Sequence, residues 1–289
     1  MRELQGRVAV ITGGGSGIGA ALSGACADRG MGVVVADVEG RAAEEVARSL
    51  RERGGDAIGC EVDVRDRDAI ESLADVADEY FGKCHLLCNN AGVMVTRPVL
   101  ELAEKDWEWS LSVNLWGVIH ATSVFLPRML AHSEGGHIVN TASIVGLAAL
   151  AQGGLGAYTT TKFALVGFSE YLREELRTQG APIGVSVVCP GAVTTRIAES
   201  ERNRPPELDV GTVPVASESD PRATQTPGKQ SSEEVAEAIL AGVEADDTWI
   251  LTHPEMKSLI ESRSDALLAA FDAAALRRAG LRRGDAASP

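Results

Sequence analysis

The feature of this sequence that most limits its fold is a regular alternation of short apolar runs with longer amphipathic stretches. Apolar runs rich in β-branched residues predict strands at residues 7–12, 32–37, 57–63, 85–91, 136–143, 184–190 and 248–252. Apolar residues at helical spacing predict a helix that ends near residue 29 and further helices at 41–53, 67–81, 106–131, 158–179 and 232–244. Short buried strands joined by helices form a parallel sheet that is covered on both faces. The sequence therefore predicts an α/β fold, a doubly wound parallel sheet of about seven strands with helices on both faces.

The composition favours one domain over two of similar size. The 289 residues are 45% hydrophobic and 24% charged, and neither a repeat nor a break in composition divides residues 1–254. Within this domain, residues 195–231 are rich in Pro, Ser, Thr and charge, and a loop of that length is usually either a lid over a binding site or disordered. We expect it to close over the substrate. Residues 255–289 predict a charged, alanine- and leucine-rich helix at 255–278 followed by a flexible tail.

The charge and hydropathy of the chain exclude several classes of partner. The net charge is −14, from 27 basic and 41 acidic residues, and a nucleic-acid-binding protein normally shows the opposite balance. The basic cluster of Arg277, Arg278, Arg282 and Arg283 is better explained by the negative end of a helix than by a phosphate-binding tail. No apolar run has the length of a membrane span and no signal-like segment precedes the first strand. We therefore expect a cytoplasmic protein with no membrane and no nucleic acid among its partners.

The five cysteines do not predict a metal site. Cys84 and Cys88 flank His85, but no second pair of Cys or His residues lies at a spacing that would complete the ligand set. Buried thiols in a reducing compartment explain the scattered cysteines better, and we expect no metal.

A glycine-rich segment, TGGGSGIG, follows the first predicted strand and opens the first predicted helix. Glycine lets the backbone turn tightly and approach a ligand without a Cβ atom in the way. The amide groups at the start of the helix point toward the turn and favour an anion such as a pyrophosphate. Placed between a first strand and a first helix, the segment predicts a dinucleotide site.

The spacing of Gly13, Gly17 and Gly19, written TGxxxGxG, resembles that of the short-chain dehydrogenase/reductase family. The resemblance implies a Rossmann-type sheet in which Ser16 and Ile18 also bind the cofactor. Asp37 ends the second strand, where a carboxylate can bind both ribose hydroxyls of NAD. A 2′-phosphate there would be repelled by about 4 kcal/mol per pair of unit charges at about 4 Å. We therefore expect NAD, with NADP less favoured.

Three further segments match the family's cofactor-binding pattern. The third strand ends at Asp63 and Val64, which the resemblance places at the adenine edge. The fourth strand ends in NNAG, whose second asparagine is expected beside the adenosine ribose, and CPGAVTTR after the sixth strand is expected to hold the nicotinamide carboxamide. The residues implied are Asn90, Ala91 and Gly92 in the first of these motifs and Pro190, Gly191, Val193 and Thr194 in the second.

Tyr158 and Lys162 stand one turn apart at the start of a predicted helix, so that their side chains project from the same surface. With Ser143 at the end of the fifth strand, they resemble the family's Ser and YxxxK catalytic residues, and Asn114 matches a fourth. A free tyrosine, with a pKa near 10, is a poor base at neutral pH. A neighbouring ammonium and a positive nicotinamide ring would lower that pKa. The resemblance implies that Tyr158 is the general acid/base and that Tyr158 and Lys162 both contact the cofactor. It implies that Ser143 holds the substrate oxygen and that Asn114 supports a bound water.

These residues predict an NAD-dependent oxidoreductase that interconverts a secondary alcohol and a ketone. The apolar segment before Tyr158, which includes Leu147 and Gln152, and the size of the 195–231 lid favour a bulky hydrophobic substrate, either alicyclic, terpenoid or steroid-like. Two alternatives remain: an NADP-dependent ketoreductase of acyl or polyketide chains, and a non-catalytic dinucleotide-binding sensor on the same fold. The family also implies a homo-oligomer, a dimer or a homotetramer, paired through the helices near 106–131 and 158–179.

Overall fold

A computed structural model describes residues 1, 3–150, 154–211 and 229–285, with residues 279–285 described by their backbone alone. The chain divides into two compact units, Met1–Thr252 and His253–Pro289, and each is described by itself. Part of the expected lid, at 212–228, and Gln152 of the apolar segment lie outside the described residues.

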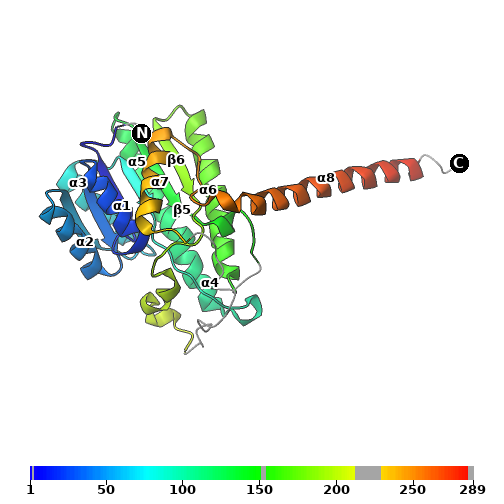
Figure 1. Cartoon of the computed structure of the whole chain (residues 1–289), viewed down its shortest axis with the longest axis horizontal. Coiled ribbons are helices and arrows are strands. Elements are labelled where there is room, and N and C mark those ends of the chain that lie inside the picture. Colours follow the sequence, from blue (N-terminus) through cyan, green and yellow to red (C-terminus); the bar gives the residue numbers. More distant parts are fainter. Residues whose placement is uncertain (2, 151–153, 212–228, 286–289) are drawn as a thin grey trace. The chain divides into compact units, whose positions relative to one another are not determined.

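The first unit is built on one seven-stranded parallel sheet in the order β3-β2-β1-β4-β5-β6-β7. Figure 1 shows the sheet with helices packed around it. The order reverses between β1 and β4, and such a reversal opens a crevice at the carboxyl ends of the strands. The strands are β1 (Val8–Thr12), β2 (Gly32–Asp37), β3 (Asp56–Glu61), β4 (Leu86–Asn89), β5 (Gly136–Thr141), β6 (Ile183–Val188) and β7 (Trp249–Ile250). The predicted Rossmann-type sheet with helices on both faces is confirmed.

Helices cover both faces because successive residues of each central strand point to opposite sides. In β1, Val10 packs with one core cluster, and Ala9 and Ile11 pack with the other. One face is covered by α1 (Gly17–Asp28), α2 (Gly40–Glu52) and α7 (Ser232–Ala245). The other is covered by α3 (Arg67–Phe81), α4 (Glu104–Leu111), α5 (Gly117–Ala131) and α6 (Gly156–Thr178).

Three strands and one helix differ from the sequence prediction in a way that concerns the site. The strands predicted at 85–91, 136–143 and 184–190 leave the sheet at residues 89, 141 and 188, because the polar segments that follow turn toward the crevice. The single helix predicted at 106–131 is α4 and α5 joined by a π-helical turn, Ser112–Trp116. A π turn inserts an extra residue into the helix, and such turns are frequent at functional sites.

The second unit consists of a short 3₁₀ turn, Pro254–Met256, and the helix α8, Lys257–Asp285, which is longer than the 255–278 expected. Leu267, Leu268 and Phe271 of α8 are exposed. Within the described part of the chain, no helix is long and apolar enough to span a membrane.

Candidate active site

The glycine turn between β1 and α1 adopts backbone conformations that require glycine. Gly13 and Gly17 have φ angles of +63° and +53°. A Cβ atom on Gly13 would lie 2.7 Å from the Cα atom of Ala91, and one on Gly17 would lie 3.1 Å from Cγ2 of Thr195. The turn is therefore packed tightly against the segments that follow β4 and β6, at the amino end of α1.

Asp37 ends β2 with its carboxylate held by the backbone on both sides. Oδ2 accepts a 2.9 Å hydrogen bond from the Gly15 amide and Oδ1 accepts one of the same length from the Glu39 amide. The fixed carboxylate lies beside the glycine turn and lines a cavity at the carboxyl ends of the strands. Two backbone bonds leave further lone pairs on its oxygens for a ligand.

Asn90 connects the end of β4 to the glycine turn. Its Nδ2 donates to the carbonyl oxygens of Thr12 and Gly13 at 3.2 and 3.1 Å. The Thr12 hydroxyl in turn accepts hydrogen bonds from the amides of Asn90 and Ala91. These bonds hold the two sides of the crevice together at the point where the strand order reverses.

Ser143, Tyr158 and Lys162 meet in the same cavity, although they come from different elements. Ser143 follows β5, whereas Tyr158 and Lys162 lie one turn apart at the start of α6. The Lys162 Nζ atom lies 5.4 Å from the centroid of the Tyr158 ring and donates a 2.7 Å hydrogen bond to the carbonyl oxygen of Thr141. All three side chains are at least nine-tenths buried.

Burial dominates the titration of the tyrosine and the lysine. It raises the pKa of Tyr158 to about 12, while a hydrogen bond with Ser143 acts in the opposite direction. Burial also lowers the pKa of Lys162 to about 8, with a small opposing contribution from the nearby Cys189 thiol. In the protein without cofactor the pKa of the phenol is therefore raised, because the cost of burying phenolate dominates.

Asn114 lies in the π-helical turn between α4 and α5, behind the cavity wall. Its Nδ2 donates to the carbonyl oxygen of Val93 and to Oγ1 of Thr161 at 2.9 and 3.1 Å, and its Oδ1 accepts from the Val93 amide at 2.8 Å. The side chain thus joins the segment after β4 to α6, close to Lys162.

The structure brings most of the predicted site residues to one cavity. Those that line it are Gly13, Ser16, Gly17, Ile18, Asp37, Asp63, Val64, Asn90, Ala91, Gly92, Ser143, Tyr158, Lys162, Pro190, Gly191 and Val193. Asn114, Gly19 and Thr194 do not line it. The carbonyl oxygen of Gly13 fills the space that a Cβ atom on Gly19 would need.

Thr194 does not line the cavity, and its backbone is hydrogen-bonded to Gln230 and Ser232. The Thr194 amide donates to the Gln230 carbonyl and its own carbonyl accepts from the Ser232 hydroxyl. Thr195 lines the cavity instead, which the sequence analysis missed. The motif CPGAVTTR contains two adjacent threonines, and the backbone conformation after β6 decides which of them lines the cavity. The sequence alone does not distinguish Thr194 from Thr195 in this respect.

The described part of the expected lid crosses the cavity as two short 3₁₀ helices, Ile197–Asn203 and Pro206–Leu208. Arg196, Ile197, Ser200, Arg202 and Asn203 line the cavity, and the sequence analysis named none of them. Ion pairs with residues far away in the sequence hold this segment on both sides of the crevice. Because these pairs decide which residues of the segment face the cavity, the sequence alone could not identify them. On the β2 side Arg202 pairs with Glu39, and on the α4 side Arg204 pairs with Asp106 at 2.7 Å.

Comparison with known proteins identifies the family. The model of the short chain dehydrogenase family matches residues 7–206 of this chain. The chain belongs to the short-chain dehydrogenase/reductase family. As a member it is an oxidoreductase, and the resemblance predicted from its glycine and tyrosine motifs is confirmed.

Several members of the family resemble this chain over most of its length. A C alpha-dehydrogenase from a Sphingobium species is 35% identical over 272 residues, which cover 93% of this chain and 87% of the relative. A 1-deoxy-11-beta-hydroxypentalenate dehydrogenase from Streptomyces exfoliatus is 38% identical over 199 residues, 68% of this chain and 71% of the relative.

A solved structure of the family shows the same architecture. The short chain dehydrogenase/reductase from Burkholderia phymatum, crystallised in complex with NAD, matches with a TM-score of 0.87 and 38% identity. The match covers 93% of this chain and 96% of that one.

Proposed function

We propose that this protein is an NAD-dependent oxidoreductase that interconverts a secondary alcohol and a ketone. One observation carries the proposal: Ser143, Tyr158 and Lys162 line the same cavity as Asp37 and the glycine turn. A proton-transfer group and a dinucleotide cradle in one cavity are what hydride transfer at a carbinol carbon requires.

The residues present fit NAD. Gly13 and Gly17, both with positive φ, form a tight turn at the amino end of a helix whose amides favour a pyrophosphate. The Asp37 carboxylate is oriented by two backbone amides to accept from ribose hydroxyls, and it opposes a 2′-phosphate. The complex of the Burkholderia phymatum relative with NAD supports the same assignment.

The side chains divide the proton chemistry between them. When bound, NAD accepts the hydride from the alcohol carbon. Ser143 holds the substrate oxygen next to Tyr158, and the phenol oxygen takes up the hydroxyl proton in oxidation and returns it in reduction. Lys162, fixed to the Thr141 carbonyl, binds the nicotinamide ribose and adds positive charge that favours the phenolate. We also assign to Thr195 the contact with the nicotinamide carboxamide that the sequence suggested for Thr194.

The cavity wall next to the catalytic residues favours a hydrophobic substrate. Among the residues that line the cavity, Val93, Trp109, Val113, Ala142 and Ile197 are apolar. The relatives from Sphingobium and Streptomyces exfoliatus are named as dehydrogenases, and the name of the second gives 1-deoxy-11-beta-hydroxypentalenate as its substrate. We therefore propose a bulky alicyclic, terpenoid or steroid-like alcohol.

We also propose a cytoplasmic homo-oligomer, a dimer or a tetramer. Four of the five cysteines are buried and all five are free, which suits a reducing compartment. On the helices expected to pair, Trp116 and Tyr171 are exposed.

A turnover screen tests the proposal. The purified protein should reduce NAD in the presence of one or more bulky secondary alcohols, followed by the absorbance of reduced nicotinamide, and should discriminate against NADP. A protein that binds no dinucleotide, or that binds NAD and oxidises no alcohol of the panel while NADP supports ketone reduction, would contradict it.

A further inference from the structure

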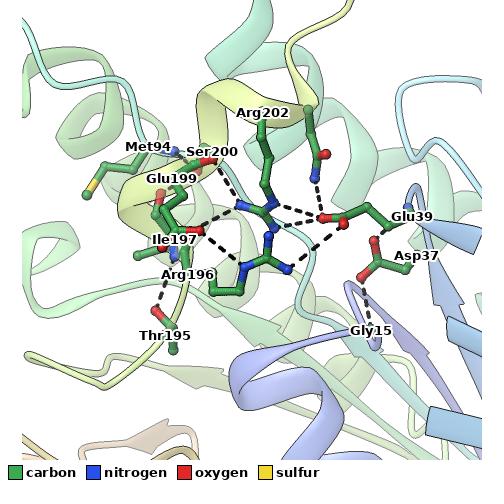
Figure 2. A network of polar contacts seen from close by, with 11 residues as sticks. Gly15, Asp37, Glu39, Met94, Thr195, Arg196, Ile197, Glu199, Ser200 and Arg202 are labelled. Atoms are coloured by element: carbon green, nitrogen blue, oxygen red, sulfur yellow. Dashed lines mark hydrogen bonds and ion pairs between the residues drawn. The ribbon is translucent and has the colours of Figure 1, made fainter. Parts of the chain in front are cut away.

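A cluster of charged residues joins the lid segment to the turn after β2 (Figure 2). Nε of Arg202 donates to Oε1 of Glu39 at 2.9 Å, and its Nη2 lies 2.8 Å from that oxygen. Nδ2 of Asn203 donates to the same oxygen at 2.9 Å. Nη1 of Arg196 lies 3.9 Å from Oε2 of Glu39. One carboxylate therefore contacts two guanidinium groups that are more than 150 residues away along the chain.

This cluster lies at the part of the cavity that we assign to the adenosine ribose. Asp37, Arg196 and Arg202 line the same cavity, and the Glu39 amide donates to the Asp37 carboxylate. Figure 2 shows the two guanidinium groups beside Glu39 with Asp37 on its other side. A phosphate on the ribose 2′-oxygen would therefore enter a region that contains two arginines as well as Asp37.

The hydrogen bonds of the two arginines show why they do not already form a phosphate site. Besides the bonds to Glu39, Nη1 of Arg202 donates to the carbonyl oxygens of Arg196 and Glu199. Nε of Arg196 donates to the Glu199 carboxylate at 3.2 Å. The hydrogen bond from Asn203 and the pairing with Arg202 hold the pKa of Glu39 below its usual value, so that its charge is present at neutral pH.

We propose that Glu39 is a second determinant of cofactor specificity: it neutralises Arg202 and Arg196, which would otherwise bind a 2′-phosphate. The proposal rests on the proposed function, because it needs the adenosine ribose at Asp37. A phosphate monoester carries about −1.5 to −2 charges at neutral pH, and guanidinium groups bind it through paired hydrogen bonds. Asp37 repels that phosphate directly, and Glu39 withholds the cations that would attract it.

The test measures the dissociation constants of NAD and NADP for four proteins: wild type, Asp37→Ser, Glu39→Gln and the double variant. Calorimetry gives both constants without requiring turnover. We expect Asp37→Ser alone to admit NADP weakly. Adding Glu39→Gln should then raise the preference for NADP over NAD by about a further tenfold, because charge-assisted bonds to the phosphate replace those to Glu39.

Two controls identify the cause. Glu52→Gln removes the same charge from an exposed pair with Arg48 at the far end of α2, and it should leave the ratio of the two constants unchanged. Arg202→Met in the double variant should abolish most of the gain. A gain that persists there would overturn the role of Arg202, and an unchanged ratio in the double variant would overturn the role of Glu39.

The result also separates this inference from the function on which it rests. If the wild type binds NAD but Glu39→Gln never shifts the ratio, only the inference fails. If the wild type binds neither dinucleotide, the proposed function and the inference fail together.

Discussion

The ammonium group of Lys162 donates a 2.7 Å hydrogen bond to the carbonyl oxygen of Thr141, the last residue of β5. Ser143 follows two residues later, so one strand end positions both the serine and the lysine of the site. Lys162 is only 2% exposed, and burial lowers its pKa to about 8. The hydrogen bond holds the charge in place, while burial makes that charge costly.

This cost predicts how stability depends on pH. The unfolded chain keeps Lys162 protonated up to its ordinary pKa of 10.5, whereas the folded protein releases the proton near 8. Between these values the unfolded state binds more protons, so the free energy of unfolding rises with pH. Relative to Lys162→Met, the wild type should gain about 2 kcal/mol between about pH 7.5 and pH 9.5 in urea unfolding. A difference that stays constant over this range would show that the lysine keeps its ordinary pKa.

The glycine turn gives a second prediction, through a matched pair of glycines with positive φ. Gly13 has φ +63° and no space for a Cβ atom, whereas Gly54 has φ +87° and nothing within 4 Å of that position. Gly54→Ala should cost about 1–2 kcal/mol of stability through backbone strain and leave cofactor binding unchanged. Gly13→Ala should cost more and weaken NAD binding by at least about tenfold, as measured by chemical unfolding and calorimetry. Equal effects of the two substitutions would mean that the close approach to Ala91 is unimportant.

The buried ion pair that joins residues 197–208 to α4 gives a third prediction. Asp106 is fully buried between Arg97 at 3.0 Å and Arg204 at 2.7 Å, and the Arg204 guanidinium stacks 4.2 Å from the ring centroid of Trp109. Asp106→Asn should destabilise the protein by about 3–5 kcal/mol, because it leaves buried cations uncompensated. Glu201→Gln removes a half-exposed partner of the same Arg204 and should cost less than about 1 kcal/mol. Chemical unfolding measures both, and similar losses would argue against a buried anchor.

A buried histidine sets the response to acid. Burial lowers the pKa of His137, on β5, to about 3 from an ordinary value of 6.5. As the pH falls through this interval, His137 takes up a proton in the unfolded state but not in the folded state. The free energy of unfolding therefore decreases. From about pH 6.5 to pH 4.5 the wild type should lose about 2 kcal/mol more than His137→Asn in urea unfolding. Parallel pH profiles for the two proteins would contradict this assignment.

The sheet, and the meeting of Ser143, Tyr158 and Lys162 in one cavity, could be predicted from the sequence because both depend on local signals. Apolar runs located the strands, and their order placed the segments after β1, β2, β4, β5 and β6 at one edge. Ser143 and Tyr158 reach the same cavity because one follows a strand and the other opens the next helix.

The remaining features of the site depend on interactions between distant parts of the chain. The π-helical turn at Asn114 keeps the apolar pattern of a continuous helix, so periodicity could not reveal it. The cavity-facing residues of the lid are fixed by Glu39 and Asp106, which lie roughly 100 or more residues earlier in the chain. Neither ion pair leaves a pattern that can be recognised in the lid sequence itself.

The most direct test of the proposed mechanism compares Tyr158→Phe with Tyr171→Phe, two substitutions of the same kind on α6. Tyr171 is 69% exposed and lies away from the cavity lining. Steady-state oxidation of the best alcohol with NAD should fall by about 10²–10⁴-fold in Tyr158→Phe, with the NAD dissociation constant changed less than about threefold, and should be unaffected in Tyr171→Phe. A Tyr158→Phe variant that turns over at the wild-type rate would contradict the assignment of the phenol as the proton-transfer group.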